Sequence, residues 1–260
     1  MLPVSVIIPT HNSAETIERA IESVLKQDML PKEIIVVDDC STDNTVELVR
    51  TISTPDTVEL KLVRLDTNLG PSVARNAGWN VANCEFIAFL DSDDSWHPMK
   101  LRIQTGWMAN NPEIQVTGHL IGDTQRVLLA KDLLIRTFRL RDFLIKNRIS
   151  TPTVMIRRSV TSRFDPKLRF AEDYGLWLRL LATYEIVVRI ETPLAQLHKA
   201  KFGESGLSSK IFRMYRGELT AVTDVWKKHH ISLLTLTTTC SWLSLKFIVR
   251  VARTTIRKIA

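Results

Sequence analysis

The stretch FIAFLDSDDSW, residues 86–96, decides how this sequence is interpreted. Its five apolar residues are typical of a strand buried on both faces, and they run directly into three carboxylates, Asp91, Asp93 and Asp94. Two carboxylates placed two residues apart beyond a strand can approach one hard cation such as Mg²⁺ or Mn²⁺, which prefers oxygen ligands. A solvated acidic turn explains the same spacing, so this stretch alone leaves both interpretations open.

Strand and helix patterns alternate upstream of this stretch. Apolar runs at residues 4–9, 33–37 and 58–65 predict three further strands, and helical patterns between them include one at residues 71–82 with proline in its first turn. This alternation indicates an α/β fold with a mostly parallel central sheet flanked by helices. Polar residues follow three of the strands, at the edge where such sheets bind ligands. The sequence has no GxGxxG or GxxxxGK[ST] motif, so Rossmann dinucleotide and P-loop interpretations lack their phosphate-binding loop.

The pattern is less regular after residue 96. We expect helices at residues 98–110, at residues 133–145 and from about Asp173. The expected strands are residues 114–119, 126–129, 153–157, 186–190 and 194–198. Residues 199–209 have the composition of a loop.

The basicity of the chain belongs to its C-terminal end. The net charge is +7, and no acidic residue follows Asp224. Seven basic residues do follow it: Lys227, Lys228, Lys246, Arg250, Arg253, Arg257 and Lys258. Residues 1–224 are therefore formally neutral. The excess positive charge lies in a tail of residues 225–260 and indicates that this tail contacts an anionic partner or solvent.

We expect this tail to be a basic amphipathic helix. Lys246, Arg250, Arg253 and Arg257 recur at i, i+4, i+7 and i+11, which places them on one helical face. Such a helix suits an anionic membrane surface, although a helix packed on the domain with a solvated basic face fits the same pattern. Residues 231–245 are too few and too rich in Ser and Thr to predict a transmembrane helix. No recognition motif accompanies the basic residues, so nucleic acid is not an expected partner.

Four segments of the chain, taken in order, resemble the family 2 glycosyltransferases of the GT-A fold. They are VSVIIPTHNSAETIERAIESVLKQ from Val4, KEIIVVDDCSTDNT from Lys32, NLGPSVARNAG from Asn68 leading into FIAFLDSDDSW, and FAEDYGLWLRL from Phe170. The resemblance extends to about Ser209. It implies a GT-A fold, a nucleotide-sugar donor that is usually UDP-linked, and inversion at the anomeric carbon.

The resemblance also implies donor-binding residues. Pro9, Thr10 and His11 match the positions that hold the nucleoside, and Asp39 looks like the partner of uracil. Arg75 matches a contact on the base side of the nucleotide, whereas a surface arginine on the helix at residues 71–82 is the alternative.

The carboxylates of the opening stretch match the DxD pair of the family. Asp91 would lie near the ribose and the metal, and Asp93 would bind Mn²⁺ or Mg²⁺ directly between the protein and the diphosphate. Asp94 would shape the site or contact the sugar. Trp96 would contact a sugar or support the site, whereas Trp177 belongs to an apolar helical stripe and is expected in the core. His198 and the loop after it lie where relatives close over the diphosphate.

Glu172 and Asp173 match the ED pair of the family, in which Asp173 looks like the general base and Glu172 supports the acceptor side. An acceptor hydroxyl is a poor nucleophile until a carboxylate accepts its proton. A bound metal offsets the charge that develops on the departing diphosphate. Capping of the helix that starts near Asp173 explains the two acidic residues without catalysis.

The sequence therefore predicts an inverting, metal-dependent hexosyl- or N-acetylhexosaminyltransferase of class EC 2.4. Residues 1–95 would be the nucleotide-binding half and residues 96–224 the acceptor-binding half. The expected acceptor is a glycan or a sugar on polyprenyl diphosphate, in the biosynthesis of O-antigen, capsule or exopolysaccharide. Oligomeric state, sugar and linkage are not predicted.

Two alternative functions, and the cellular location, are also considered from the sequence. A sugar nucleotidyltransferase would need a glycine-rich basic loop where PTHNSAET stands. A non-catalytic membrane-binding module would keep the fold without the chemistry. Cys40, Cys84 and Cys240 are widely separated and fit a reducing cytoplasm, so we expect a peripheral location on the inner face of the cell membrane.

Overall fold

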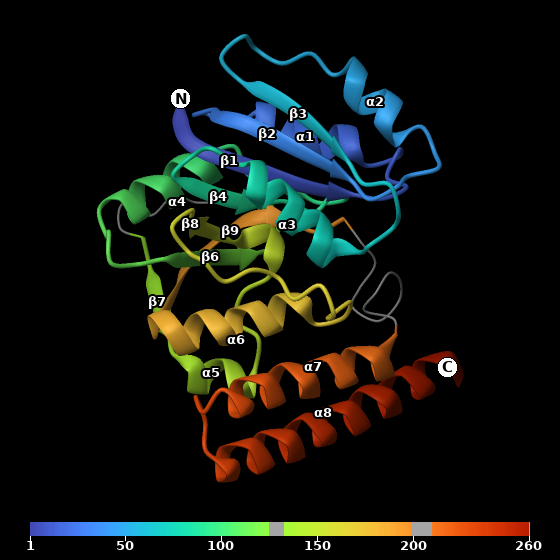
Figure 1. Cartoon of the computed structure of the whole chain (residues 1–260), viewed down its shortest axis with the longest axis vertical. Helices are drawn as coiled ribbons and strands as arrows, with labels where there is room; N and C mark the ends of the chain where they lie inside the picture. Colours follow the sequence, from blue (N-terminus) through green and yellow to red (C-terminus); the bar gives the residue numbers. More distant parts are fainter. Residues whose placement is uncertain (125–132, 199–209, 260) are drawn as a thin grey trace.

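The computed structural model describes residues 1–124, 133–198 and 210–259, and in this part of the chain nine strands form one sheet (Figure 1). Its path is β3-β2-β1-β4-β8-β6-β9-β5, with β7 paired to β9. The α/β fold with flanking helices predicted from the sequence is confirmed. The strand expected at residues 126–129 and the loop at 199–209 lie outside the described residues.

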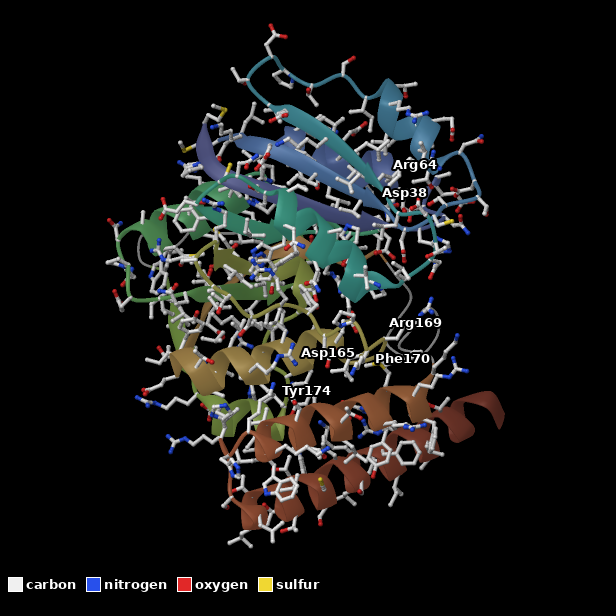
Figure 2. All side chains as sticks on the ribbon, in the orientation of Figure 1. Asp38, Arg64, Asp165, Arg169, Phe170 and Tyr174 are labelled. Carbon is white, nitrogen blue, oxygen red and sulfur yellow. The ribbon has the colours of Figure 1, made fainter. Side chains whose placement is uncertain are left out.

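The N-terminal half contains the parallel part of the sheet. Its strands are β1 (Leu2–Thr10), β2 (Pro31–Asp38), β3 (Glu59–Arg64) and β4 (Phe86–Phe89). Its helices are α1 (Ile17–Leu25), α2 (Thr45–Thr51) and α3 (Pro71–Val81). In the pairing register Thr10 lies beside Asp38, and Asp38 lies beside Arg64. The polar residues that end these strands therefore share one edge of the sheet, where Figure 2 shows Asp38 and Arg64 side by side.

The second half makes the sheet mixed. Its elements are β5 (Ser95–Trp96), α4 (Lys100–Ala109), β6 (Val116–Ile121), β7 (Ile135–Phe138), α5 (Leu140–Ile145), a 3-10 helix η2 (Thr151–Thr153), β8 (Met155–Arg157), α6 (Glu172–Tyr184) and β9 (Val187–Gln196). Strand β8 is antiparallel to both β4 and β6, whereas β6 and β9 are parallel. This arrangement brings the ends of β6 and β9 next to the edge formed by β1, β2 and β4.

Two local predictions for this half were wrong. Residues 133–145 were expected to be one helix, but residues 135–138 form strand β7 and only α5 is helical, because the backbone of β7 pairs along β9 and buries Phe138. Residues 186–198 were expected to contain two strands, but β9 is continuous. The polar interruption around Pro193 is accommodated where the register with β6 shifts, as in a β-bulge.

The core lies on both faces of the sheet. Ile7 of β1 packs in the cluster on the side of α3 and α6, whereas its neighbours Val6 and Ile8 pack on the side of α1. Four aromatic rings in the first cluster meet edge to face at centroid distances of 5.4–6.4 Å: Trp79, Phe89, Phe164 and Trp177. The core position expected for Trp177 is confirmed, and this packing fixes α6 against the sheet.

The C-terminal helices α7 (Ile211–Lys227) and α8 (Leu233–Ile259) form an antiparallel pair that covers α6 and α5 (Figure 1). Tyr215 of α7 stacks on Phe247 of α8 with ring centroids 4.6 Å apart. The Arg250 guanidinium lies 3.1 Å from the Glu218 carboxylate of α7. Among the helices of the described residues, none has the length and apolarity needed to cross a membrane.

Candidate active site

The loops after β1 and β2 are bound to each other at the carboxyl edge of the sheet. His11 Nδ1 lies 2.9 Å from the Asp39 carbonyl oxygen, and the Asn12 side-chain oxygen accepts a bond from the Thr42 amide at 2.8 Å. Asn12 and Cys40 both have left-handed backbone angles, with φ of 49° and 61°, which cost strain and are frequent at functional sites. The expected nucleoside-binding segment from Pro9 to His11 is therefore held rigidly beside Asp39.

Asp39 connects this edge to α3. Its two carboxylate oxygens accept hydrogen bonds from the backbone amides of Leu69 and Gly70, each at 2.7 Å. Gly70 has φ of 89°, which glycine adopts without a Cβ penalty, and Pro71 begins the helix directly after it. The Asp39 carboxylate thus fixes the start of the helix that carries Arg75.

Arg75 joins the DxD and ED segments. Its guanidinium lies 2.8 Å from Asp91 through Nη2 and 2.9 Å from Glu172 through Nη1, and its side chain is only 6% exposed. Burial alone would lower the pKa of Arg75, but the charges of Asp91 and Glu172 outweigh it and raise that pKa, so the guanidinium stays protonated. The alternative of a surface arginine is wrong. Two motifs 80 residues apart in sequence meet at one buried cation.

The DxD turn closes tightly on its own backbone. The Asp94 amide donates to the Asp91 carbonyl oxygen at 3.1 Å, and Arg19 donates to the Asp93 carbonyl oxygen at 2.7 Å. The Asp91 side chain is one-quarter exposed, whereas Asp94 is buried. These contacts place the Asp91 carboxylate at the surface of the edge.

The residues after the turn lie deeper. Trp96 is buried and donates through its indole N–H to the Pro152 carbonyl oxygen at 2.7 Å, so it supports the site from within the core. The Ser95 hydroxyl lies 2.8 Å from His198 Nε2. His198 is therefore near the DxD turn, while the loop that follows it is outside the described residues.

Asp173 lies in the first turn of α6, directly after Ala171, whose φ of 55° is left-handed. One carboxylate oxygen of Asp173 accepts from the Tyr174 amide at 2.6 Å, and the other accepts from the Asn147 side chain at 3.2 Å. Burial and the neighbouring charge of Glu172 raise the pKa of Asp173 to about 7, although the Tyr174 amide, Arg75 and Asn147 oppose the shift. A carboxylate that titrates near neutral pH suits a proton acceptor.

The acidic edge offers two carboxylates for a cation. In the part of the chain that the structure describes, no group of three or more His, Cys, Asp or Glu side chains forms a complete metal site. Asp91 and Asp93 nevertheless supply the hard oxygen donors that Mg²⁺ and Mn²⁺ prefer, and Mg²⁺ commonly binds one or two carboxylates together with substrate phosphates. The two residues therefore fit a cation that arrives with a diphosphate.

Asn147 is the site residue that sequence reasoning missed. It follows α5 and contacts Asp173 from 26 residues away. A single asparagine in an irregular segment gives no pattern, so only the packing of α5 beside α6 reveals it.

The mixed sheet and its flanking helices form a fold of the GT-A transferase type. A solved structure of Staphylococcus aureus TarS in complex with UDP-GlcNAc superposes with a TM-score of 0.68 and 25% identity, over 86% of this chain and 66% of that one. The sequence model described as glycosyl transferase family 2 matches residues 5–163, more than half of the chain. The chain belongs to glycosyl transferase family 2.

Two curated relatives are similar over most of their length. A provisionally named teichuronic acid biosynthesis glycosyltransferase of Bacillus subtilis is 36% identical, over 68% of this chain and 71% of the relative. A UDP-Glc:α-D-GlcNAc-diphosphoundecaprenol β-1,3-glucosyltransferase of Escherichia coli is 34% identical, over 68% of this chain and 69% of the relative. The resemblance seen in the four sequence segments is thereby confirmed.

Proposed function

We propose that this glycosyltransferase moves a hexosyl or N-acetylhexosaminyl group from a UDP-sugar to a carbohydrate acceptor, with inversion, in the biosynthesis of a bacterial surface polysaccharide. The observation that carries the proposal is the buried Arg75, which joins Asp91 of the DxD segment to Glu172 beside Asp173. This bridge supports the proposal that a donor-side carboxylate, Asp91, and a base, Asp173, act at one edge of the sheet. The names of the two curated relatives support the substrate class.

The donor is assigned to the nucleotide-binding half, residues 1–95. Pro9, Thr10 and His11 would contact the nucleoside, and Asp39 would face the uracil. Asp93, with Asp91 beside it, would hold Mg²⁺ or Mn²⁺, which when bound supplies positive charge against the leaving diphosphate. The UDP-GlcNAc complex of TarS supports a UDP-linked donor.

The acceptor is assigned to residues 96–224. Asp173 would accept the proton of the acceptor hydroxyl as the new glycosidic bond forms, and a pKa of about 7 lets it be ionised at neutral pH and still bind the proton. Asn147 orients the carboxylate, because it donates to one of its two oxygens. Glu172 is paired with Arg75, and its charge contributes to the raised pKa of Asp173.

Release of UDP from a panel of UDP-sugars, with and without a lipid-diphosphate sugar acceptor, tests the proposal. We expect one donor to give UDP release that an acceptor accelerates and that EDTA stops, and a product of inverted anomeric configuration. Full activity in EDTA would remove the metal from the mechanism. A protein that binds anionic vesicles but releases no UDP would be the non-catalytic membrane module, whereas pyrophosphate release from a sugar phosphate and UTP would indicate a nucleotidyltransferase.

The C-terminal tail, residues 225–260, is assigned to an anionic membrane surface at the cytoplasmic face. Part of the basic face that the sequence predicted for α8 is turned toward the protein and not toward solvent. Arg250 pairs with Glu218 of α7, and Lys246 is half-buried. The exposed side chains of α8 include the apolar Leu234, Trp242, Leu245, Ile248 and Val249, with Thr237, Ser241 and Arg253 among them. An exposed apolar face with an indole suits insertion at the lipid interface.

Vesicle flotation tests this assignment. The wild-type chain should float with phosphatidylglycerol vesicles, and Leu245→Asp should not. Val81→Asp, at an exposed apolar position on α3, is the matched control and should still float. Equal flotation of the two variants would contradict a lipid contact through α8.

A further inference from the structure

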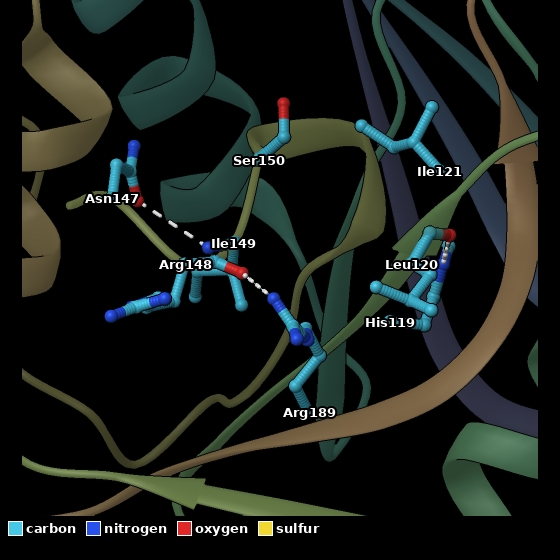
Figure 3. A pocket seen from close by; sticks show the side chains of 8 residues that line it. All are labelled: His119, Leu120, Ile121, Asn147, Arg148, Ile149, Ser150 and Arg189. Carbon is cyan, nitrogen blue, oxygen red and sulfur yellow. Dashed lines mark hydrogen bonds between the residues drawn. The ribbon is translucent and has the colours of Figure 1, made fainter. Parts of the chain in front are cut away.

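A pocket lies beside Asn147, the residue that donates to the Asp173 carboxylate. Figure 3 shows it between the end of β6, the segment that follows α5, and the start of β9. Its volume is about 300 Å³, and its lining residues are His119, Leu120, Ile121, Asn147, Arg148, Ile149, Ser150 and Arg189. Asn147 belongs both to this pocket and to the surroundings of Asp173, since it donates to the Asp173 carboxylate. A ligand whose hydroxyl reaches Asp173 would extend into this space.

Two guanidinium groups are gathered at the pocket. Arg148 and Arg189 both lie against the ring of Phe138, with their guanidinium carbons 5.6 Å and 5.0 Å from its centroid. Arg189 also donates to the Arg148 carbonyl oxygen at 2.9 Å, as drawn in Figure 3. Both positive charges therefore lie around one ring at the pocket, where an anionic ligand would gain charge-assisted hydrogen bonds.

Protein carboxylates offset only part of this charge. Arg189 pairs with Glu191 at 2.6 Å, and Arg136 shares the same carboxylate at 3.6 Å. Within the described residues, no carboxylate lies within ion-pairing distance of Arg148, which donates instead to the Asp142 carbonyl oxygen at 3.4 Å. Two arginines therefore share one carboxylate, Arg148 has no carboxylate partner among the described residues, and the lining of the pocket contains no acidic side chain.

The other polar groups of the lining also suit an anion. The side-chain amide of Asn147 and the hydroxyl of Ser150 are hydrogen-bond donors at its rim. The buried His119 is not one of these donors, because burial lowers its pKa to about 3 and its Nδ1–H donates to the Leu120 carbonyl oxygen at 2.9 Å, which leaves Nε2 as an acceptor. A neutral sugar alone would leave the Arg148 charge without a counter-ion.

We infer that this pocket binds the acidic group of the acceptor, a phosphoryl or a carboxylate group, with Arg148 and Arg189 as its cationic partners. The inference rests on the proposed transfer to a carbohydrate acceptor, and it adds that the acceptor is an acid. A sugar phosphate or lipid diphosphate and a uronic acid share this chemistry. Guanidinium groups bind both kinds of oxyanion through two parallel hydrogen bonds.

Calorimetric titration of the UDP-saturated protein tests the inference, because UDP occupies the donor side. The probes are glucose 1-phosphate, methyl glucuronide and the neutral methyl glucoside. We expect at least one acid to bind about 10- to 100-fold more tightly than methyl glucoside, as charge-assisted hydrogen bonds predict. A preference for the phosphate alone would indicate a phosphorylated acceptor, and a preference for the glucuronide alone would indicate a uronic acid.

Variants identify the residue responsible. Arg148→Gln should abolish the preference for the acid, Arg148→Lys should keep part of it, and the melting temperature of each should confirm folding. Arg141→Gln, which removes an equal charge from the exposed surface of α5, is the matched control and should keep the whole preference.

Equal binding of acids and methyl glucoside, or an unchanged preference in Arg148→Gln, would overturn the inference. UDP binding and UDP release are measured separately. If the chain releases UDP from its donor but shows no preference for acids, the result contradicts only the proposal that the pocket binds an anionic group. A chain that prefers acids but binds no UDP contradicts only the proposed function.

Discussion

Two pairs of carboxylates lie at the edge of the sheet: Asp91 with Asp93, and Glu172 with Asp173. The residues of the two pairs are chemically similar, but their surroundings differ. Both Asp91 and Asp173 are half-buried, but Asp91 lies at a strand end directly against Arg75, whereas Asp173 lies beside Glu172 at the start of α6 and is linked to Arg75 only through Glu172. Desolvation and the neighbouring charge of Glu172 raise the pKa of Asp173, so this carboxylate favours the uptake of a proton. The surroundings, and not the residue type, separate a cation-binding role from a basic one.

The strongest test of this difference exchanges each carboxylate for its amide. Asp173→Asn should lower the transfer rate by about 10²–10⁴-fold and leave the affinity for the UDP-sugar unchanged, because only proton transfer is lost. Asp93→Asn should instead weaken binding of the UDP-sugar in the presence of Mn²⁺. Donor titrations and initial rates measure both effects. If Asp173→Asn retained substantial transfer, the general base would lie elsewhere.

The bridge between the two pairs is tested next. Arg75→Lys keeps the positive charge, but a lysine has one ammonium group and cannot contact Asp91 and Glu172 through two separate nitrogen atoms. We therefore expect the transfer rate to fall about 10- to 100-fold. Arg157→Lys is the matched control, because Arg157 also pairs with a carboxylate, Glu85, and lies over a ring, Phe86, away from the site. Equal losses of activity in the two variants would mean that Arg75 acts only on stability, which thermal unfolding measures in parallel.

The pH dependence of transfer should follow Asp173. With a pKa of about 7, the ionised form falls to roughly one-tenth at pH 6, so the rate should drop about tenfold between pH 8 and pH 6. Asn147→Ala removes a hydrogen bond that lowers this pKa and should move the profile to higher pH. A profile of transfer rate that is flat from pH 6 to pH 8 would contradict a base of this pKa.

The same pKa has a consequence for stability. Asp173 titrates near 3.8 when unperturbed and near 7 in the folded chain, so the folded state holds a proton that the unfolded chain has released between these values. The stability this group contributes is complete below pH 4 and is lost as pH rises through 7. Asp173→Asn should therefore melt a few degrees above the wild type at pH 8 and show little difference at pH 4. Differential scanning calorimetry at the two pH values measures this.

The smallest expected effect concerns the turn before Asp173. A Cβ on Gly217 of α7 would collide with the Phe170 carbonyl oxygen, next to the left-handed Ala171. Gly217→Ala should lower the melting temperature by several degrees and reduce transfer a few-fold, while donor binding at Asp91 and Asp93 is spared. Gly106→Ala on α4, where a Cβ meets no atom within 4 Å, is the control and should be neutral or slightly stabilising. If Gly217→Ala also weakened donor binding, a change next to the Glu172–Asp173 pair would be shown to affect the Asp91–Asp93 pair as well.

The sequence predicted the structure of residues 1–95 better than that of residues 96–224, for a physical reason. In β1, β2 and β4 both faces are buried, so each strand is a continuous apolar run that ends at a polar residue. Strand β7 is short and edge-paired, and β9 passes a proline at a register shift, so their patterns resemble a helix and two strands. Pairing across the sheet decided those elements, and local sequence did not.

The sequence by itself determined the α/β class, the family and the order of the four motifs, because buried strands and motif spacing are local properties of the chain. Only the tertiary structure decided how the motifs work together. It placed Arg75 between Asp91 and Glu172, brought Asn147 to Asp173, and turned Arg250 of the predicted basic face toward Glu218. Each of these contacts joins residues 16 to 97 positions apart, and such contacts depend on how helices pack on the sheet, which no periodicity in the sequence encodes.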